Sequence, residues 1–274
     1  MSRIKYIPAL GILFILLMGC EKVITVDIKD TSMKYVIEGV INDDSTCRVR
    51  ISRTSNFYDT LDLTGISNAV VTLTEAGEDA LVLRETTDAG VYRATATGVP
   101  GHSYTLNVKI DTLEFTATST MPQKVELDSL YVTERVFLGK DRMFATVQFK
   151  DPPETGNAYK FVQYVNGNQE TNIFVLNDVL VNNRTVVNDL LIYDDEYTLY
   201  KCDQLRVVME CIDQPMYTYW YSLNQSALGS SQSASPGNPA TNIQGGALGY
   251  FSAYTASSLN IAVAPDSSCS YSSD

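Results

Sequence analysis

Few side chains in this sequence could carry out a reaction. Its 274 residues include one histidine, His102, which lies in a predicted turn between two strands. Ser-His-Asp hydrolases and metalloproteases use histidine as a base or ligand, and one histidine in a turn does not supply either set. The sequence has no GxSxG, P-loop or strand-linked GxGxxG motif. The glycine-rich run at 245–249 lacks the lysine and hydroxyl that hold phosphate, so we expect a tight turn before a strand there.

Two groups of acidic residues are the remaining candidates for chemistry. Asp43-Asp44 and Asp194-Asp195-Glu196 could bind Ca²⁺, and a glycosidase needs only two carboxylates. Neither group matches an EF-hand loop, and consecutive acids on a strand point to opposite faces. We therefore interpret both groups as solvated hairpin ends. The sequence predicts no catalytic residue, no metal site and no cofactor, and a hydrolase with paired carboxylates stays as an alternative.

The cysteines could be sites of lipid attachment or could form disulfides. Cys47 and Cys211 alternate with apolar residues at even spacing, so both are predicted to face a core. Spacing alone does not establish pairing, and a Cys202–Cys269 disulfide is one pairing left open. None of the cysteines has the spacing of a zinc site.

The N-terminal segment has the features of an export signal. Arg3 and Lys5 precede an apolar run at 7–18, which is about a dozen residues long, whereas a membrane-spanning helix needs roughly 20. The run ends at Leu17-Met18-Gly19-Cys20, which resembles the lipobox of bacterial lipoproteins. That resemblance implies cleavage of a signal peptide at 1–19 and diacylglycerol on the Cys20 thiol, with the lipid bilayer as partner. The alternative is a cytosolic chain with a buried apolar N-terminus.

Charge and the residue after Cys20 suggest where the protein acts. The net charge of −12 repels phosphate backbones, so nucleic acid is not expected as a partner. Residue 21 is glutamate rather than the aspartate that commonly retains lipoproteins at the inner membrane, so we predict an outer-membrane anchor. The sequence leaves open whether the anchor lies in the surface or the periplasmic leaflet, and we prefer the surface.

Hydrophobic periodicity predicts an all-β protein with two β-rich domains. After a lipidated tether at 20–33, about seven short strands with polar turns fill residues 34–122, the pattern of an antiparallel sandwich. The turn and strand at 100–106 look like those of immunoglobulin-like or transthyretin-like domains. Proline at 122 ends this unit.

The second predicted domain, at 123–264, is less regular. Its strands are expected at 144–150, 159–165, 172–176, 205–212, 250–254 and 259–263. One helix is predicted after Asp213, a candidate N-cap. Aromatic side chains including Trp220 would lie on one face of that helix and pack on a sheet. A serine-rich tail follows at 265–274.

Several stretches together resemble one family. They are Cys20-Glu21-Lys22-Val23-Ile24, Tyr35-Val36-Ile37-Glu38-Gly39, Ser67 to Leu73, Gly90-Val91-Tyr92, Pro100 to Tyr104, and Asn238-Pro239 with Asn242 to Tyr254. In this order they resemble the Bacteroidota lipoproteins called domain of unknown function 4249 (DUF4249). The resemblance implies a non-enzymatic partner of a TonB-dependent outer-membrane transporter. It carries over no catalytic or binding residues.

The 17 tyrosines and Trp220 support a second hypothesis. Aromatic side chains on an exposed face could bind a glycan or another ligand, and the protein would then act without a fixed transporter. Half-buried strand tyrosines would explain the same composition. Burial of these side chains would therefore weaken the glycan hypothesis.

Overall fold

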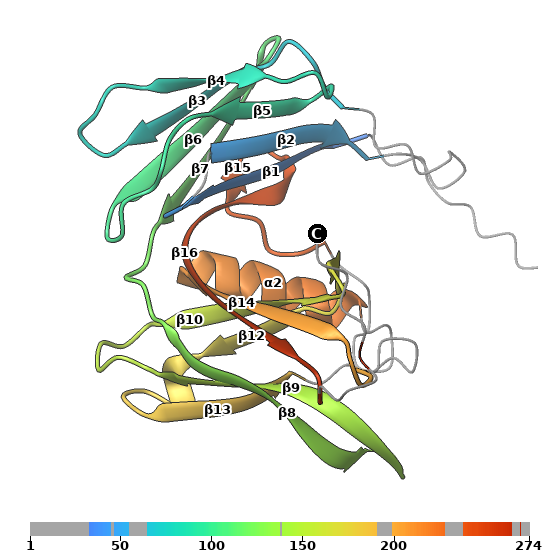
Figure 1. The fold of residues 1–274 in the computed structure, drawn as a ribbon. Coiled ribbons are helices and arrows are strands. Elements are labelled where there is room, and N and C mark those ends of the chain that lie inside the picture. Colours follow the sequence, from blue (N-terminus) through green and yellow to red (C-terminus); the bar gives the residue numbers. More distant parts are fainter. Residues whose placement is uncertain are drawn as a thin grey trace, which may run out of the picture. The chain divides into compact units, whose positions relative to one another are not determined.

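The computed structural model describes residues 33–44, 47–54, 65–137, 139–190, 199–227, 238–264 and 269. Within them most residues lie in β-strands, and the helical elements are one α-helix and one 3₁₀-helix, which agrees with the all-β fold predicted from the sequence (Figure 1). The predicted signal peptide and the tether up to residue 32 lie outside the described residues.

The first region contains the expected seven strands. They are β1 (Tyr35–Asn42), β2 (Cys47–Arg53), β3 (Val70–Glu75), β4 (Leu81–Glu85), β5 (Val91–Ala94), β6 (Ser103–Ile110) and β7 (Leu113–Thr120). Alternation of apolar and polar residues buries one side of each strand, as with Val49 and Ile51 of β2. The buried side chains form one hydrophobic core, with Ile37 and Val49 fully buried.

Strand β4 connects the two sheets of this sandwich. It pairs with β3 through Val71 and Leu83, and with β5 through Arg84 and Arg93. The strand order through the sandwich is β1-β2-β5-β4-β3-β6-β7. The neighbouring pairs within this order are antiparallel, as predicted.

The second region has a more complex order. Its elements are β8 (Leu127–Phe137), β9 (Lys140–Lys150), β10 (Ala158–Val165), β11 (Asn168–Gln169), β12 (Phe174–Asn177), η1 (Asp178–Leu180), β13 (Thr185–Leu190), β14 (Gln204–Ile212), α2 (Gln214–Ala227), β15 (Ile243–Gln244) and β16 (Leu248–Ala262). Strands β13, β9 and β8 form a separate sheet. A second core, containing Phe149, Phe161 and Val207, packs that sheet against β10 and β14.

Strand β16 corrects the prediction for the end of the chain. The two strands expected at 250–254 and 259–263 are one continuous strand from Leu248 to Ala262. Its first half pairs in parallel with β1, and its second half pairs antiparallel with β14. Figure 1 shows β16 running from beside β1 to beside β14.

Consequently, the C-terminal part of the chain completes the first region. Phe251 and Ala253 of β16 are fully buried in the sandwich core, whereas Val263 belongs to the second core. Strand β15 also pairs with β7 across the predicted boundary at residue 122. By their contacts, residues from Met33 onward form one compact unit.

The close approach of β16 to β1 gives a prediction about Gly249. This glycine has a φ of 97°, and a Cβ there would lie 2.0 Å from the carbonyl oxygen of Ile37. Gly249→Ala should therefore lower the free energy of unfolding by about 3 kcal/mol or more, from a disfavoured φ and a backbone clash. Urea denaturation would measure the loss.

Gly246→Ala is the matched control for this substitution. Gly246 has a similar φ of 90°, but a Cβ there would meet nothing within 4 Å. It should lose only the conformational part, about 1 kcal/mol. Equal losses in the two variants would contradict the role assigned to the β1–β16 contact.

Candidate functional site

The lipidation site predicted at Cys20 lies outside the described residues. In the part of the chain that the structure describes, no helix has the length and apolarity to cross a membrane. The acidic group at 194–196 also lies outside it. The candidate sites within the described residues therefore consist of polar and aromatic side chains of the folded body.

The other four cysteines divide into two kinds. Cys202 and Cys269 form a disulfide, the pairing that the sequence leaves open. It ties a residue of the predicted serine-rich tail to the residues just before β14. Cys47 and Cys211 are free and buried, as predicted, and burial raises the pKa of Cys47 to about 12. The two buried thiols are therefore poor nucleophiles.

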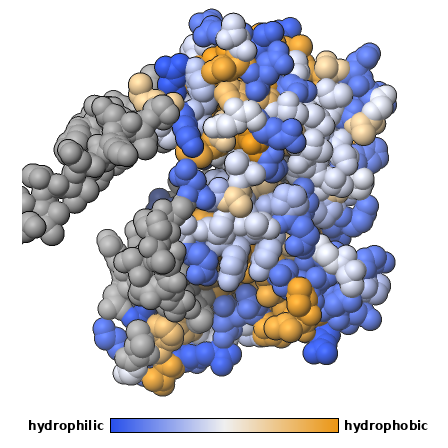
Figure 2. Space-filling view, turned by 180° about the vertical axis from the view of Figure 1, so that it is seen from behind, coloured by the Kyte–Doolittle hydropathy of each residue, from blue (hydrophilic) through white to orange (hydrophobic). Residues whose placement is uncertain are grey.

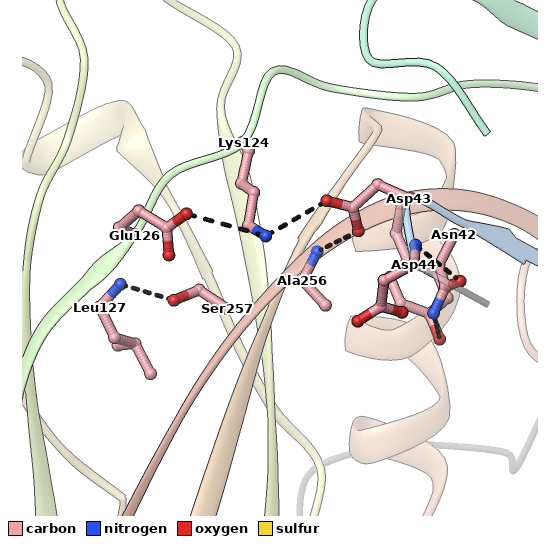
Figure 3. Close-up of polar contacts among 9 residues, drawn as sticks. Asn42, Asp43, Asp44, Lys124, Glu126, Leu127, Ala256 and Ser257 are labelled. Atoms are coloured by element: carbon pink, nitrogen blue, oxygen red, sulfur yellow. Dashed lines mark hydrogen bonds and ion pairs between the residues drawn. The ribbon is translucent and has the colours of Figure 1, made fainter. Parts of the chain in front are cut away.

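Asp43 and Lys124 form a polar junction between the two regions (Figure 3). One carboxylate oxygen of Asp43 lies 3.3 Å from Lys124 Nζ, and the other accepts a hydrogen bond of 3.0 Å from the Ala256 N–H. Lys124 also lies 3.7 Å from a Glu126 oxygen. Burial alone would lower the pKa of Lys124, but Asp43 and its acidic neighbours raise it. Lys124 therefore stays charged and holds Asp43 beside β16.

The contacts of Asp43 argue against the calcium site considered from the sequence. Asp43 binds a lysine and a backbone N–H instead of presenting free oxygens. Among the described residues, no group of three or more histidine, cysteine, aspartate or glutamate side chains is placed to hold a metal. His102, the lone histidine, is exposed and contacts Glu75.

Asp213 forms a second polar link between the two regions. As predicted, it caps α2, because its Oδ1 accepts a 3.1 Å hydrogen bond from the Met216 N–H. Its Oδ2 accepts hydrogen bonds from the Ser119 hydroxyl at 2.7 Å and the Thr120 N–H at 3.1 Å, both on β7. Burial raises the pKa of Asp213, although these three donors oppose the shift.

Helix α2 packs its aromatic side chains on the sheet. The rings of Tyr219 and Trp220 lie 5.0 Å and 4.9 Å from that of Tyr250 on β16, between ring centroids. Burial raises the pKa of Tyr219 to about 12. Lys160 lies 4.4 Å from the centre of the Trp220 ring and 2.9 Å from a Glu210 oxygen. Core packing therefore accounts for most of this aromatic group, as predicted from the sequence.

A shallow pocket continues the same sheet face along β10, β14 and β16. Its volume is about 420 Å³, and its lining includes Tyr164, Gln204, Arg206 and Asn260. Tyr164 lies opposite Arg206, and Arg206 opposite Asn260. The Arg206 guanidinium lies 5.5 Å from the centre of the Tyr164 ring. An aromatic face with amide and guanidinium donors can bind a polar ligand. No motif in the sequence indicates this pocket, because its residues come from three separate strands.

Two polar side chains lie unpaired inside the second region. Gln163, 1 % exposed, shares the strand face of Tyr159 and Phe161, and the Glu170 N–H donates to the backbone carbonyl oxygen of Gln163. Among the described residues, neither polar side-chain atom of Gln163 nor Oε2 of Glu170 has a hydrogen-bond partner. Burial raises the pKa of Glu170. Such groups lower stability unless water or another ligand satisfies them.

Comparison with known proteins adds one finding. A family model described as "Domain of unknown function (DUF4249)" matches residues 21–260. No curated protein matches the chain.

The double role of Asp213 gives a prediction about stability. Asp213→Ala should reduce the free energy of unfolding by about 2–3 kcal/mol, because it removes the helix cap and leaves donors of β7 unpaired. Asp213→Asn keeps an acceptor for the cap and should lose only about 1 kcal/mol. Urea denaturation would rank the variants. Asp128→Ala, at an exposed position, is the control and should change stability by less than about 0.5 kcal/mol.

Glu170 gives a prediction about pH. Because burial raises its pKa, the folded chain keeps the proton to a higher pH than the unfolded chain does. The unfolded chain therefore releases the proton first as pH rises above about 4.5, and the free energy of unfolding falls. Glu170→Gln cannot ionise, so it should be more stable than the unmodified protein at pH 7.

The advantage of Glu170→Gln should shrink as pH falls toward 4.5. Denaturation curves at several pH values would test this, with Glu154→Gln at an exposed position as control. A pH-independent difference between Glu170→Gln and the unmodified protein would show that ionisation of Glu170 is not the cause.

Proposed function

This chain belongs to the DUF4249 family, and we propose that it is a lipid-anchored outer-membrane accessory protein that acts as a non-enzymatic partner of a TonB-dependent nutrient transporter. The family match leaves the activity unassigned. The proposal therefore rests on the residues of this chain and on the family resemblance described from its sequence.

The observation that carries the proposal is the N-terminal leader. Two basic residues, an apolar run at 7–18 and Leu17-Met18-Gly19-Cys20 follow in the order that lipid attachment requires. Two or three acyl chains hold a protein at a bilayer stably, whereas one does not. The described body begins at Met33, so a tether of about a dozen residues would join it to the anchor.

The surface of the body supports a binding role. Several large apolar side chains are exposed, among them Val179 at 76 % and Leu180 at 83 %, both in η1. Figure 2 shows apolar side chains in small separate patches among polar ones on the face it draws. Small apolar patches are common on protein surfaces, so a contact made through them would depend on a tether that raises the local concentration of both partners.

The pocket beside Tyr164 supports the alternative, a lipoprotein that binds a glycan or other polar ligand without a fixed transporter. Its aromatic ring, two amides and guanidinium are groups that sugars contact. The observation against it is that Arg206 already lies near the Tyr164 ring. Calorimetry with a glycan library would test the alternative, and Tyr164→Ala should abolish any binding found.

The transporter proposal predicts a defined crosslinking result. Crosslinking in native outer membranes, followed by mass spectrometry of the tagged full chain, should recover a TonB-dependent transporter. Cys20→Ala should reduce that yield at least tenfold, because loss of the anchor removes the high local concentration. Recovery of other proteins with no transporter would contradict the proposal. Mass measurement of the N-terminal peptide would independently report whether Cys20 carries lipid.

A further inference from the structure

Three arginines form a row on the outer face of the sandwich. Arg48 of β2 lies opposite Arg93 of β5, and Arg93 lies opposite Arg84 of β4. All three side chains are exposed. Neighbouring residues on antiparallel strands are about 5 Å apart at Cα, so the row spans roughly 10 Å across three strands. Residues far apart in the sequence thus present three guanidinium groups side by side.

The fold does not need this row for stability. Like charges directly opposite each other on neighbouring strands are destabilising. Among the described residues, the side chains of Arg48, Arg84 and Arg93 make no ion pair or hydrogen bond that would offset the repulsion. The chain as a whole carries a net charge of −12. An uncompensated basic row on an acidic protein therefore calls for an anionic partner.

Apolar side chains lie next to the arginines. Beyond Arg84 and Arg93, strands β4 and β5 no longer pair with each other. A pocket of about 570 Å³ lies there, lined by Arg84, Arg93, Leu81, Val82, Ala94 and Thr95. Val82 is 59 % exposed and Leu81 37 % exposed. Basic and apolar side chains therefore share one small surface, which is the combination found where proteins lie on the interface of a bilayer.

We propose that the arginine row, with Leu81 and Val82, is a docking surface for an anionic lipid bilayer. The guanidinium groups bind headgroup phosphates, for which their planar donor geometry is suited. The two apolar side chains enter the interface beside them. This inference rests on the proposed function, because a lipid anchor holds the body close to a bilayer.

Tether length and charge favour a lipid surface over an acidic protein. The 13 residues from Cys20 to the start of the body reach at most about 45 Å when extended, so the row stays within reach of the bilayer. An acidic body is repelled by anionic headgroups everywhere except at a basic surface. Docking through the row would fix one orientation of the body and leave its other faces open to a partner.

Arginine-specific labelling of the full chain tests the inference residue by residue. The protein is bound to vesicles of phosphatidylglycerol with phosphatidylcholine, or of phosphatidylcholine alone, and treated with a dicarbonyl reagent. Mass spectrometry should show labelling of Arg48, Arg84 and Arg93 reduced several-fold on the anionic vesicles, and restored by high salt. Labelling of Arg184 and Arg206 should not change. Equal labelling of the row on both vesicles would overturn the inference.

A triple variant supplies the second test. In the full chain carrying Cys20→Ala, so that no acyl chain contributes, Arg48→Gln, Arg84→Gln and Arg93→Gln together should weaken binding to the anionic vesicles about a hundredfold. The control triple, Lys109→Gln, Arg184→Gln and Lys201→Gln, makes the same change of net charge at exposed positions elsewhere. Equal losses in the two triples would overturn the inference.

Failure of the anchor and failure of the row give different results. If Cys20 carries no lipid but the row is still protected by anionic vesicles, the proposed function fails and the docking surface stands. If Cys20 is lipidated and anionic vesicles do not protect the arginine row from labelling, the docking surface fails and the proposed lipid anchor stands. The arginine variant should also denature at an equal or higher urea concentration than the unmodified protein, because it removes like-charge neighbours.

Discussion

The parallel ladder between β1 and β16 is the interaction on which the rest of the fold depends. It joins the first described strand to the last, over a separation of 212 residues at Asn42 and Tyr254. Gly39 leaves room for Phe251 there, since a Cβ on Gly39 would lie 2.9 Å from that ring. The sandwich core thereby receives a fully buried aromatic ring from the C-terminal part of the chain. Phe251 belongs to the first core and Val263 to the second, so the segment around β16 contributes to both.

The sequence revealed local structure well, because period-two alternation appears within one strand. All seven strands of the first region were predictable in this way. The helix and its Asp213 cap were predictable from a different local pattern, an N-cap residue followed by aromatic residues at helical spacing. Strand β8 was not, because a bulge between Leu127 and Ser129 breaks its alternation. The continuity of β16 was hidden because its middle residues, Thr255 to Ser258, are small or polar although Thr255 is fully buried.

Features that depend on register could not be predicted. The arginine row exists only because three strands pair so that Arg48, Arg93 and Arg84 are aligned. The Asp43–Lys124 junction likewise joins a turn that the sequence suggested to be a solvated hairpin end with a residue outside any motif. Cys20 is the opposite case, because its signal is a contiguous motif that requires no fold. The candidate sites in this chain are thus of two kinds. Some are contiguous motifs in the sequence, and others form only when strands pair in the folded protein.

The hydrogen-bond partners of the acidic side chains change how the acidic composition is interpreted. Buried carboxylates serve as acceptors inside the fold: Asp151 accepts from the Tyr159 hydroxyl and the Asn183 N–H, and Asp178 from two backbone N–H groups. Hydrogen bonds of this kind make a buried carboxylate tolerable and fix the loops that provide the donors. Asp43 and Asp213 do the same between the two regions. These acidic side chains are occupied by contacts within the fold, whereas the arginine row has no ion-pair or hydrogen-bond partner among the described residues. The protein can therefore carry a net negative charge and still present a surface that binds anions.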